Sequence, residues 1–260
     1  MRIAPAFPSR SEAIEIPWSG VAARRRLVHG FDSRNASSRS FNLIRSKLVS
    51  LQRERSWRML GIVSATPNVG KSFVSANLAA ALSRDPRFQT YLIDLDLRRG
   101  TIKEIFGIDP ETSIVDYLED SHTGELLSGY VPQGQELIII PSATSQVHSA
   151  ELLAGERAMA LFRGMRNSDE RNFFICDLPP VFANDDASII MEALDGYVIV
   201  AQDGKTTTRE IEAAVEMLGH DRLAGVVLNK YRGGLVSEGY GIEERYASEY
   251  YSNSDVADEE

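Results

Sequence analysis

Residues 64–72, SATPNVGKS, combine a turn with a lysine and a hydroxyl side chain. Gly70, Lys71 and Ser72 match the second half of the phosphate-binding pattern G-x-x-x-x-G-K-[ST], while Ala65 occupies the position of its first glycine. In such a loop the backbone N–H groups face phosphate oxygens, and the following helix favours anions at its N-terminus. Lys71 then faces the β- and γ-phosphates, and Ser72 offers its hydroxyl to Mg²⁺. The alternative is an ordinary strand-to-helix turn that contains Gly-Lys-Ser.

Three aspartates follow apolar segments of the chain. Asp94 and Asp96 are one residue apart, so on a strand they share a face. Two such carboxylates beside a phosphate loop suit a magnesium shell, or a base that accepts a hydroxyl proton. Asp177 ends the apolar run FFICD before two prolines, which is the Walker B pattern. Without the phosphate loop, the pair would indicate a solvated turn and Asp177 a turn cap. With the loop, they predict one magnesium-nucleotide site.

The elements that position these residues are short apolar runs that alternate with helical patterns. Such runs are typical of a buried parallel sheet, so we expect an α/β fold with a mostly parallel sheet flanked by helices on both faces. Ligands of these sheets bind at the carboxyl ends of the strands, where the loop and the aspartates fall. The predicted strands cover residues 59–63, 90–93, 137–140, 173–176, 197–201 and 223–228, and the predicted helices cover residues 41–55, 73–83, 150–165, 187–194 and 209–218.

Composition divides the chain into three parts. Residues 1–36 mix Pro, Ser and Arg without periodicity, so we expect a flexible arm with at most one short element. Residues 37–232 contain the predicted helices and strands and form the domain. Residues 233–260 lack apolar periodicity and are rich in Glu and Tyr, which predicts a disordered acidic tail.

The overall composition limits the function. Of the 260 residues, 43% are hydrophobic and 25% are charged, as in a globular protein. The formal net charge of −9 argues against nucleic-acid binding, which depends on excess Lys and Arg. Every apolar run is shorter than the roughly 18 residues of a membrane-spanning helix. A single cysteine, Cys176, cannot form an internal disulfide. These features predict a cytoplasmic protein, so that if the chain works at a membrane, another molecule must hold it there.

The stretches SATPNVGKSFVSANLAAAL, YLIDLDLRRG, FFICDLPPV and GVVLNKY occur in this order along the chain. Together they resemble the bacterial tyrosine kinases of capsule and exopolysaccharide synthesis, from about Arg34 to Tyr231. The resemblance implies a P-loop NTPase fold shared with the ATPases that position septa and plasmids. Those ATPases carry a lysine at the position of Thr66, and its absence here favours the kinase branch.

The resemblance also implies roles for single residues. It makes Lys71, Asp94 and Asp96 catalytic, and it places magnesium on Ser72, Asp94 and Asp177. The residues that it implies for nucleotide binding are Pro67, Asn68, Val69, Gly70, Lys71, Ser72, Phe73 and Asn229. The implied activity is autophosphorylation on tyrosine that regulates polysaccharide polymerisation or export, with ATP and Mg²⁺ as cofactors.

The family phosphorylates a tyrosine cluster in its own C-terminal tail, and this chain has a matching cluster. Its members are Tyr240, Tyr246, Tyr250 and Tyr251. A polar, disordered segment cannot bury aromatic rings for stability, so the enrichment indicates another use. The alternative is a tail that only stacks on other rings. The family further implies a membrane polysaccharide co-polymerase as activator, a homo-oligomer and an opposing tyrosine phosphatase.

The sequence departs from the family in the helix that mediates assembly. The family motif E-x-x-R-x-x-R corresponds to Arg39, Asn42 and Arg45, so oligomerisation rests on Arg45 alone or on different pairings. Two other functions stay open. A partitioning-type ATPase switch is disfavoured by Thr66 and the tyrosine tail. A non-catalytic regulatory subunit that binds nucleotide is compatible with the altered helix and with Ala65.

Overall fold

The computed structural model of the chain describes residues 7–119, 127–143 and 149–231. Its strands are β1 (Ile14–Ile16), β2 (Met59–Val63), β3 (Gln89–Asp94), β4 (Tyr130–Pro132), β5 (Leu137–Ile140), β6 (Asn172–Asp177), β7 (Gly196–Gln202) and β8 (Leu223–Asn229). Its α-helices are α1 (Gly20–Arg25), α2 (Arg39–Arg55), α3 (Lys71–Leu82), α4 (Ile102–Phe106), α5 (Ile114–Leu118), α6 (Ser149–Ala154), α7 (Glu156–Asn167), α8 (Asp186–Met191) and α9 (Thr208–Leu218). Short 3₁₀ helices cover Ala36–Ser38 and His220–Arg222. The compact unit ends at Asn229, the last residue of β8.

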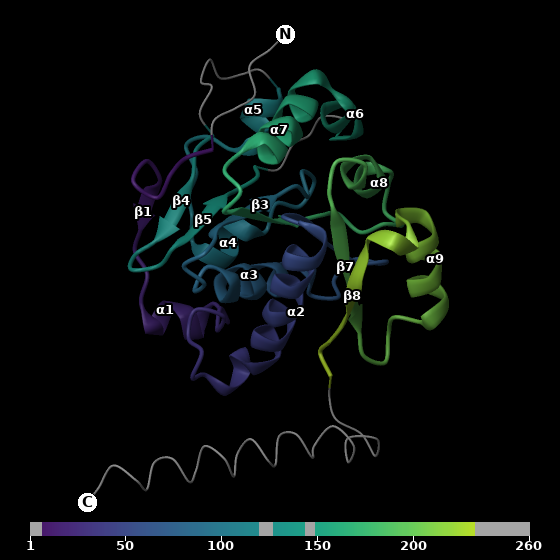
Figure 1. Ribbon diagram of the computed structural model, residues 1–260, viewed down its shortest axis with the longest axis horizontal. Helices are drawn as coiled ribbons and strands as arrows, with labels where there is room; N and C mark the ends of the chain where they lie inside the picture. The colour runs from purple at the N-terminus through teal and green to yellow at the C-terminus, as the bar shows by residue number, and fades with distance from the viewer. Residues whose placement is uncertain (1–6, 120–126, 144–148, 232–260) are drawn as a thin grey trace, which may run out of the picture. The chain divides into compact units, whose positions relative to one another are not determined.

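The described strands form one sheet in the order β1-β4-β5-β3-β6-β2-β7-β8 (Figure 1). Among them, the pair β4 and β5 is antiparallel and the other neighbouring pairs are parallel. β2, which leads into the phosphate loop, lies between β6 and β7, and β3 lies on the other side of β6. The carboxyl ends of β2, β3 and β6 therefore meet in the centre of one sheet edge.

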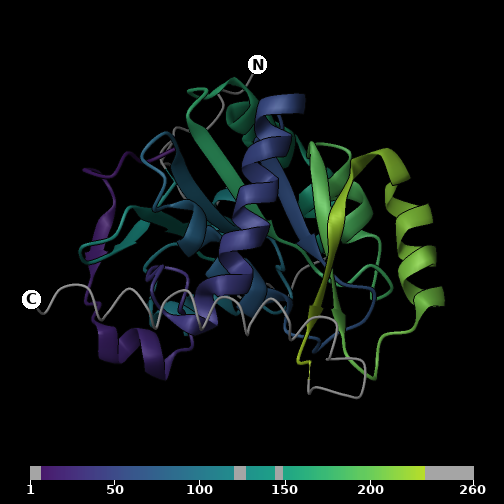
Figure 2. The ribbon, with the colours of Figure 1, turned by 60° about the horizontal axis from the view of Figure 1, so that its bottom comes forward.

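Helices cover both faces of the sheet, and each face has its own apolar core. On one face, Leu60 and Leu92 belong to a cluster with residues of α2, α3 and α4. On the other face, Met59 and Ile93 belong to a cluster with residues of α5 to α9. Figure 1 shows α2 and α3 on one side of the sheet and α6, α7 and α8 on the other, and Figure 2 shows α2 crossing in front of the sheet. Side chains alternate along a strand, so the continuous apolar strands fill both cores at once.

The predicted strands are confirmed to within one residue at either end. The prediction missed β1 and β4, since each has only three residues and β4 ends in a proline. It also missed α1, α4 and α5, which have five or six residues each. The predicted helix over 150–165 is wrong as a single element, because Gly155 has an extended backbone (φ −74°, ψ 163°) and separates α6 from α7. No helix in the described ranges combines the length and apolar character that a bilayer span requires.

The amino-terminal residues differ from the expected flexible arm. The described part of this segment contains β1, which pairs with β4, and α1, whose first turn is capped by the Ser19 side chain. The Phe7 ring packs edge-on against Tyr91 and Phe174, with centroids 5.7 and 5.1 Å away. Val28 is buried. The sequence hides this packing because the segment takes its apolar neighbours from distant parts of the chain.

Residues 27–30 lie against the helix α3 and are hydrogen-bonded there to the side chain of Asn77. The Asn77 Oδ1 atom accepts hydrogen bonds from the backbone N–H groups of His29 (2.7 Å) and Gly30 (3.1 Å). Its Nδ2 atom donates to the carbonyls of Leu27 (3.0 Å) and Phe73 (2.9 Å). A Cβ atom on Gly30 would lie 2.1 Å from the backbone carbonyl oxygen of Asn77, so only glycine permits this approach. The amino-terminal segment is therefore fixed to the same helix that begins at Lys71.

Candidate active site

The loop between β2 and α3 prepares the N-terminus of α3 for an anion. Asn68 and Gly70 have positive φ angles of 65° and 92°, and Gly70 is the residue directly before the helix. The Ser64 hydroxyl donates to the carbonyl of Thr66 at 2.9 Å, which fixes the start of the loop. Within the described chain, no side chain caps α3. The N–H groups of its first turn thus stay available, as phosphate binding at a helix N-terminus requires.

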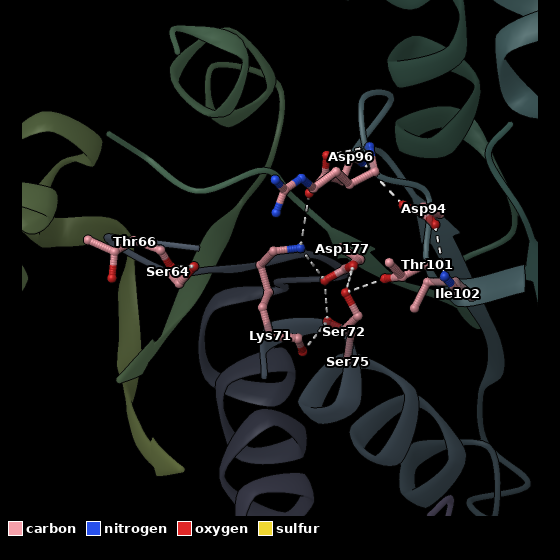
Figure 3. A network of polar contacts seen from close by, with 11 residues as sticks. Ser64, Thr66, Lys71, Ser72, Ser75, Asp94, Asp96, Thr101, Ile102 and Asp177 are labelled. Atoms are coloured by element: carbon pink, nitrogen blue, oxygen red, sulfur yellow. Dashed lines mark hydrogen bonds and ion pairs between the residues drawn. The ribbon is translucent and has the colours of Figure 1, made fainter. Parts of the chain in front are cut away.

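Asp177 is the centre of the polar cluster at this sheet edge (Figure 3). It is fully buried at the end of β6, and Lys71 Nζ lies 3.0 Å from its Oδ1 atom. The hydroxyls of Ser72 and Ser75 donate to its two oxygens at 2.6 and 2.7 Å. Thr101 donates in turn to the Ser72 hydroxyl at 2.8 Å. The phosphate loop and the end of β6 are therefore one connected network.

Lys71 is held between two carboxylates. Besides Asp177, its Nζ atom lies 3.6 Å from Asp96 Oδ2, and its side chain is only 8% exposed. Burial by itself would lower the pKa of Lys71, but the nearby carboxylates of Asp177 and Asp96 outweigh burial, and the pKa is raised. Lys71 therefore stays charged. A buried ammonium with two carboxylate partners is poised to exchange them for phosphate oxygens, which carry the same sign of charge.

Asp94 and Asp96 have different surroundings although they are one residue apart. Asp94 is fully buried at the end of β3, and its oxygens accept the backbone N–H groups of Asp96 (3.2 Å) and Ile102 (3.1 Å). Burial, followed by the nearby Asp177, raises the pKa of Asp94 well above its usual value. Burial also raises the pKa of Asp96, while Lys71 opposes the rise. Asp96 keeps slight exposure, so it is the carboxylate of the pair that a reacting group can approach.

The donor set of the cluster fits a magnesium ion. In the described residues, no group of three or more His, Cys, Asp and Glu side chains could hold a metal without other ligands. Mg²⁺ in nucleotide sites uses one or two protein carboxylates together with phosphate oxygens and waters, so an all-protein cage is not needed. The hydroxyl of Ser72 and the carboxylates of Asp94 and Asp177 are hard oxygen ligands at one strand end, where Asp94 and Asp177 are neighbours across β3 and β6. These three residues would hold the ion.

The other residues implied for nucleotide binding lie along the loop. Pro67 and Asn68 are exposed, whereas Val69 is buried. Asn229, at the end of β8, donates its amide to the Val69 carbonyl at 2.8 Å. The Phe73 ring packs against the Phe41 ring of α2 with a centroid distance of 5.8 Å, so its side chain ties α3 to α2. Asn229 thus joins the edge strand β8 to the phosphate loop.

Two sets of predicted residues lie apart from the cluster. Arg45 is half-buried on α2. Burial lowers the pKa of Arg84, which lies just beyond the C-terminal end of α3, and the nearby charge of Arg45 lowers it further. Asn42 of the altered assembly motif accepts a hydrogen bond from Arg84. The tail tyrosines Tyr240, Tyr246, Tyr250 and Tyr251 lie outside the described residues.

Sequence reasoning missed Ser75 and Thr101. Ser75 lies one helical turn after Lys71 and is fully buried in a mostly apolar helix. A serine on the same helical face as Lys71 was the signal that could have revealed its contact with Asp177. Thr101 follows the turn after β3, and its contact with Ser72 is visible only once the sheet is assembled.

The fold and this geometry define the class of protein. The sequence profile of the CobQ/CobB/MinD/ParA nucleotide binding domain matches residues 60–251. Because the match covers well over half of the chain, the chain belongs to this family of nucleotide-binding domains.

Within that class, the homologues are bacterial tyrosine kinases, which confirms the resemblance carried by the motifs. The chain is 31% identical over 202 residues to tyrosine-protein kinase wzc of Salmonella typhimurium, an alignment that covers 75% of this chain and 27% of that protein. It is 26% identical over 212 residues to tyrosine-protein kinase YwqD of Bacillus subtilis, covering 81% of this chain and 88% of that protein. The chain thus spans under a third of the length of wzc and most of the length of YwqD.

Solved structures share the fold, which confirms the predicted P-loop NTPase architecture. The chimerical protein CapA2B2 matches with a TM-score of 0.71 at 23% identity, over 87% of this chain and 95% of that chain. The kinase domain of Escherichia coli tyrosine kinase ETK matches with a TM-score of 0.63 at 24% identity, over 85% and 92%. The septum site-determining protein MinD of Pyrococcus horikoshii, complexed with Mg-ADP, matches with a TM-score of 0.57 at 21% identity, over 68% and 72%.

Proposed function

We propose that this chain is an ATP-dependent protein-tyrosine autokinase that regulates the polymerisation or export of a capsular polysaccharide or exopolysaccharide. The observation that carries the proposal is the buried Lys71 between Asp96 and Asp177 at the start of α3. This arrangement pairs a phosphate-binding cation with a carboxylate that can accept a proton. The kinship with wzc and YwqD, both named as tyrosine kinases, supports the same reaction.

In the proposed reaction, the residues of the cluster act in sequence. The backbone N–H groups of the phosphate loop and the first turn of α3 bind the phosphates of ATP, and Lys71 pairs with the γ-phosphate. The tyrosine oxygen attacks the γ-phosphorus, a new oxygen–phosphorus bond forms, and the bond from the γ-phosphorus to the bridging oxygen breaks, so that ADP leaves. Asp96 accepts the hydroxyl proton. Its burial raises its pKa, which makes it a stronger base than an exposed aspartate.

The metal has a supporting role in this proposal. Mg²⁺, when bound, neutralises charge on the phosphate oxygens. Ser72, Asp94 and Asp177 would hold it, and Thr101 orients the Ser72 hydroxyl through their hydrogen bond. The serine and the two carboxylates belong to three different elements, α3, β3 and β6, so the sheet itself sets their spacing.

The proposed acceptors are Tyr240, Tyr246, Tyr250 and Tyr251, the cluster that follows the domain. A phosphotyrosine adds roughly −1.5 to −2 charges at neutral pH, so modification changes the charge of this segment strongly. We further propose that a membrane polysaccharide co-polymerase activates the chain and holds it at the inner face of the plasma membrane. A homo-oligomer and an opposing tyrosine phosphatase complete the proposal.

The test is a phosphorylation map of the purified chain. We expect incubation with ATP and Mg²⁺ to place phosphate on the tyrosines between Tyr240 and Tyr251, as detected by mass spectrometry. Lys71→Met should abolish the modification, because it removes the cation that pairs with the phosphates. Lys205→Met is the matched control, since Lys205 is an exposed lysine before α9, and it should label like the unmodified chain.

The same experiment separates the alternatives. Release of inorganic phosphate without labelled tyrosine would identify a partitioning-type ATPase, in line with the structural likeness to MinD. Binding of ATP with neither product would identify a regulatory subunit that responds to nucleotide. Either result would overturn the autokinase.

A further inference from the structure

A further buried carboxylate, outside the cluster around Asp177, holds an arginine. Asp186, in the first turn of α8, is 1% exposed, and Ser149, at the start of α6, is fully buried. The Arg98 Nε atom donates to the Ser149 hydroxyl at 2.8 Å, and that hydroxyl donates to Asp186 Oδ2 at 2.6 Å. Arg98 Nε also lies 3.4 Å from the same carboxylate oxygen. We call Arg98, Ser149 and Asp186 the Arg98 cluster.

The carboxylate that anchors the Arg98 cluster, Asp186, is buried at a cost in stability. Within the described residues, the second oxygen of Asp186, Oδ1, has no hydrogen-bond partner. Burying a carboxylate with one unsatisfied oxygen lowers stability, and an apolar side chain in its place would avoid this penalty. Packing alone therefore gives no reason for an aspartate at this position. Its visible effect is to fix one nitrogen of Arg98.

The anchored arginine is directly connected to the reacting edge. Arg98 follows Asp96 by two residues, and the backbone N–H of Arg99 donates to Asp96 Oδ1 at 3.1 Å. The turn that carries Arg98 is thus fixed relative to the carboxylate that we assign as the base. α6 and α8 pack on the sheet face opposite to α3. The anchor of Arg98 therefore lies across the sheet from the phosphate-binding helix and its lysine.

The two ends of the Arg98 side chain differ in their surroundings. Nε faces the buried Ser149 and Asp186, whereas 54% of the side chain is exposed. In the described part of the chain, no hydrogen bond or ion pair involves its terminal Nη1 and Nη2 atoms. These two nitrogens form a planar fork that matches a carboxylate. Because the anchor already restricts the side chain, less conformational entropy is lost when a ligand binds.

From this geometry we propose that Arg98 determines acceptor specificity by binding a carboxylate next to the target tyrosine, so that the substrate class is acidic tyrosine peptides. Ser149 and Asp186 are positioning residues for it. The inference rests on the proposed kinase function and deepens it. The chain itself contains such sequences: Glu244 lies two residues before Tyr246, and Glu249 directly precedes Tyr250.

The test compares two peptides as phosphate acceptors of the full chain. One peptide copies residues 243–252, EERYASEYYS, and the other replaces its three Glu residues by Gln. A charge-assisted hydrogen bond that is lost corresponds to about a 10-fold change or more, so the KM of the acidic peptide should be at least ~10-fold lower than that of the neutral peptide. The KM for ATP should be the same with both peptides.

Variants then assign the preference to Arg98. Arg98→Gln should raise the KM of the acidic peptide to that of the neutral peptide, while kcat and the KM for ATP stay unchanged. Arg98→Lys keeps the charge but not the fork, and should restore only part of the preference. Arg163→Gln, which removes an exposed arginine of α7, is the matched control and should keep the full preference.

The positioning role of Asp186 has a separate readout. Asp186→Asn weakens the anchor of Arg98, so it should raise the KM of the acidic peptide about threefold or more and leave the KM of the neutral peptide unchanged. A purely structural role would change both peptides equally, which would remove Asp186 from the proposal. If the unmodified chain phosphorylates both peptides with equal KM, Arg98 is not a specificity residue, although the kinase stands. If neither the peptides nor the tail are phosphorylated, the proposed function fails and this inference fails with it.

Discussion

The helix α3 meets buried polar partners at two places, and the two differ in how they are satisfied. In its first two turns, Lys71, Ser72 and Ser75 all bond to the carboxylate of Asp177. In its middle, Asn77 makes four hydrogen bonds to neutral backbone groups, which is its full capacity. The first set consists of charged and hydroxyl groups that can change partners when a ligand arrives. The second set is complete without any ligand.

This difference separates two kinds of contact on a single helix: contacts that a ligand can replace, and contacts that anchor the amino-terminal segment. Charged partners at the helix N-terminus face the sheet edge, where a ligand can replace them. The neutral partners of Asn77 belong to the amino-terminal segment. They contact the middle of α3 and not its N-terminus at the sheet edge. The comparison teaches that the polar residues of one helix can be divided by the charge of their partners. We expect substitutions in the first set to change ligand binding, and substitutions in the second set to change stability.

Asp177→Asn should give the largest effect on ligand binding, because three contacts of the first set depend on this carboxylate. We expect the affinity for ATP with Mg²⁺ to fall by about 10²-fold, because the variant loses a carboxylate that would hold the ion, and removal of even a partner of a metal ligand lowers metal affinity by about 10- to 100-fold. Equilibrium titration with a fluorescent ATP analogue measures it. Asp109→Asn, at an exposed aspartate after α4, is the control. Unchanged affinity in Asp177→Asn would contradict the assignment of the first set to ligand binding.

Asn77→Ala should separate the two sets most clearly. The change leaves two backbone N–H groups and the Leu27 carbonyl without their partner, so we expect the free energy of unfolding to fall by about 3 kcal/mol. Urea unfolding measures this loss. Nucleotide affinity of the folded protein should stay unchanged. Asn167→Ala at the exposed end of α7 is the control. A variant that keeps its stability but loses affinity would reverse the comparison.

Gly30→Ala tests the same anchor by crowding it. The added Cβ would lie 2.1 Å from the Asn77 carbonyl oxygen, so backbone must shift, and we expect a loss of about 1–3 kcal/mol in the free energy of unfolding. Gly20→Ala is the matched control, since its nearest neighbour would be 3.7 Å away. Equal stability of the two variants in urea would show that the segment does not pack against α3 in solution.

Tyr91→Phe should have the smallest effect at neutral pH and a distinct one at high pH. It removes the hydrogen bond from the Tyr91 hydroxyl to the Pro8 carbonyl (3.1 Å), which contributes about 1 kcal/mol. Burial raises the pKa of Tyr91 to about 12 from its usual 10.0. The folded state thus favours the neutral hydroxyl, and its stabilising contribution is present below pH 10.0 and is lost as the pH rises toward about 12.

Unfolding midpoints measured across that alkaline range provide the check. The unmodified chain should lose stability more steeply than Tyr91→Phe. Some loss should remain in the variant, because burial also raises the pKa of Tyr197 to about 12. Identical slopes would mean that the Tyr91 hydroxyl is not buried against the amino-terminal segment.

The parts of the molecule that could be predicted from the sequence are those with local signals. Continuous apolar runs located β2, β3 and β6, and the glycine-lysine-serine turn located the start of α3. Since these strands end, and α3 begins, at one sheet edge, the sequence alone groups Lys71 with the aspartates. Gly155 shows where such signals fail, because one extended glycine divides a helix whose apolar pattern continues on both sides.

The parts that could not be predicted depend on contacts between distant residues. Asn77 is a polar residue in the middle of α3, and its partners Leu27, His29 and Gly30 lie far back in the chain. The Arg98 cluster joins the turn after β3 to the two helices α6 and α8. Gly100 lies against Ser142, where a Cβ would come within 2.9 Å. None of these pairings leaves a periodic or compositional trace in the sequence.

The anchoring of residues 27–30 has a practical consequence for dissecting the protein. Motifs alone suggest that a minimal nucleotide-binding fragment could start near residue 37. Such a truncation would remove Phe7 and Val28, which cover apolar residues of the domain. It would also remove the backbone groups that bond to the Asn77 side chain. The shortened fragment would expose apolar side chains on both faces of the sheet. A fragment that is meant to stay folded in a test tube should therefore keep the sequence from Phe7 onward.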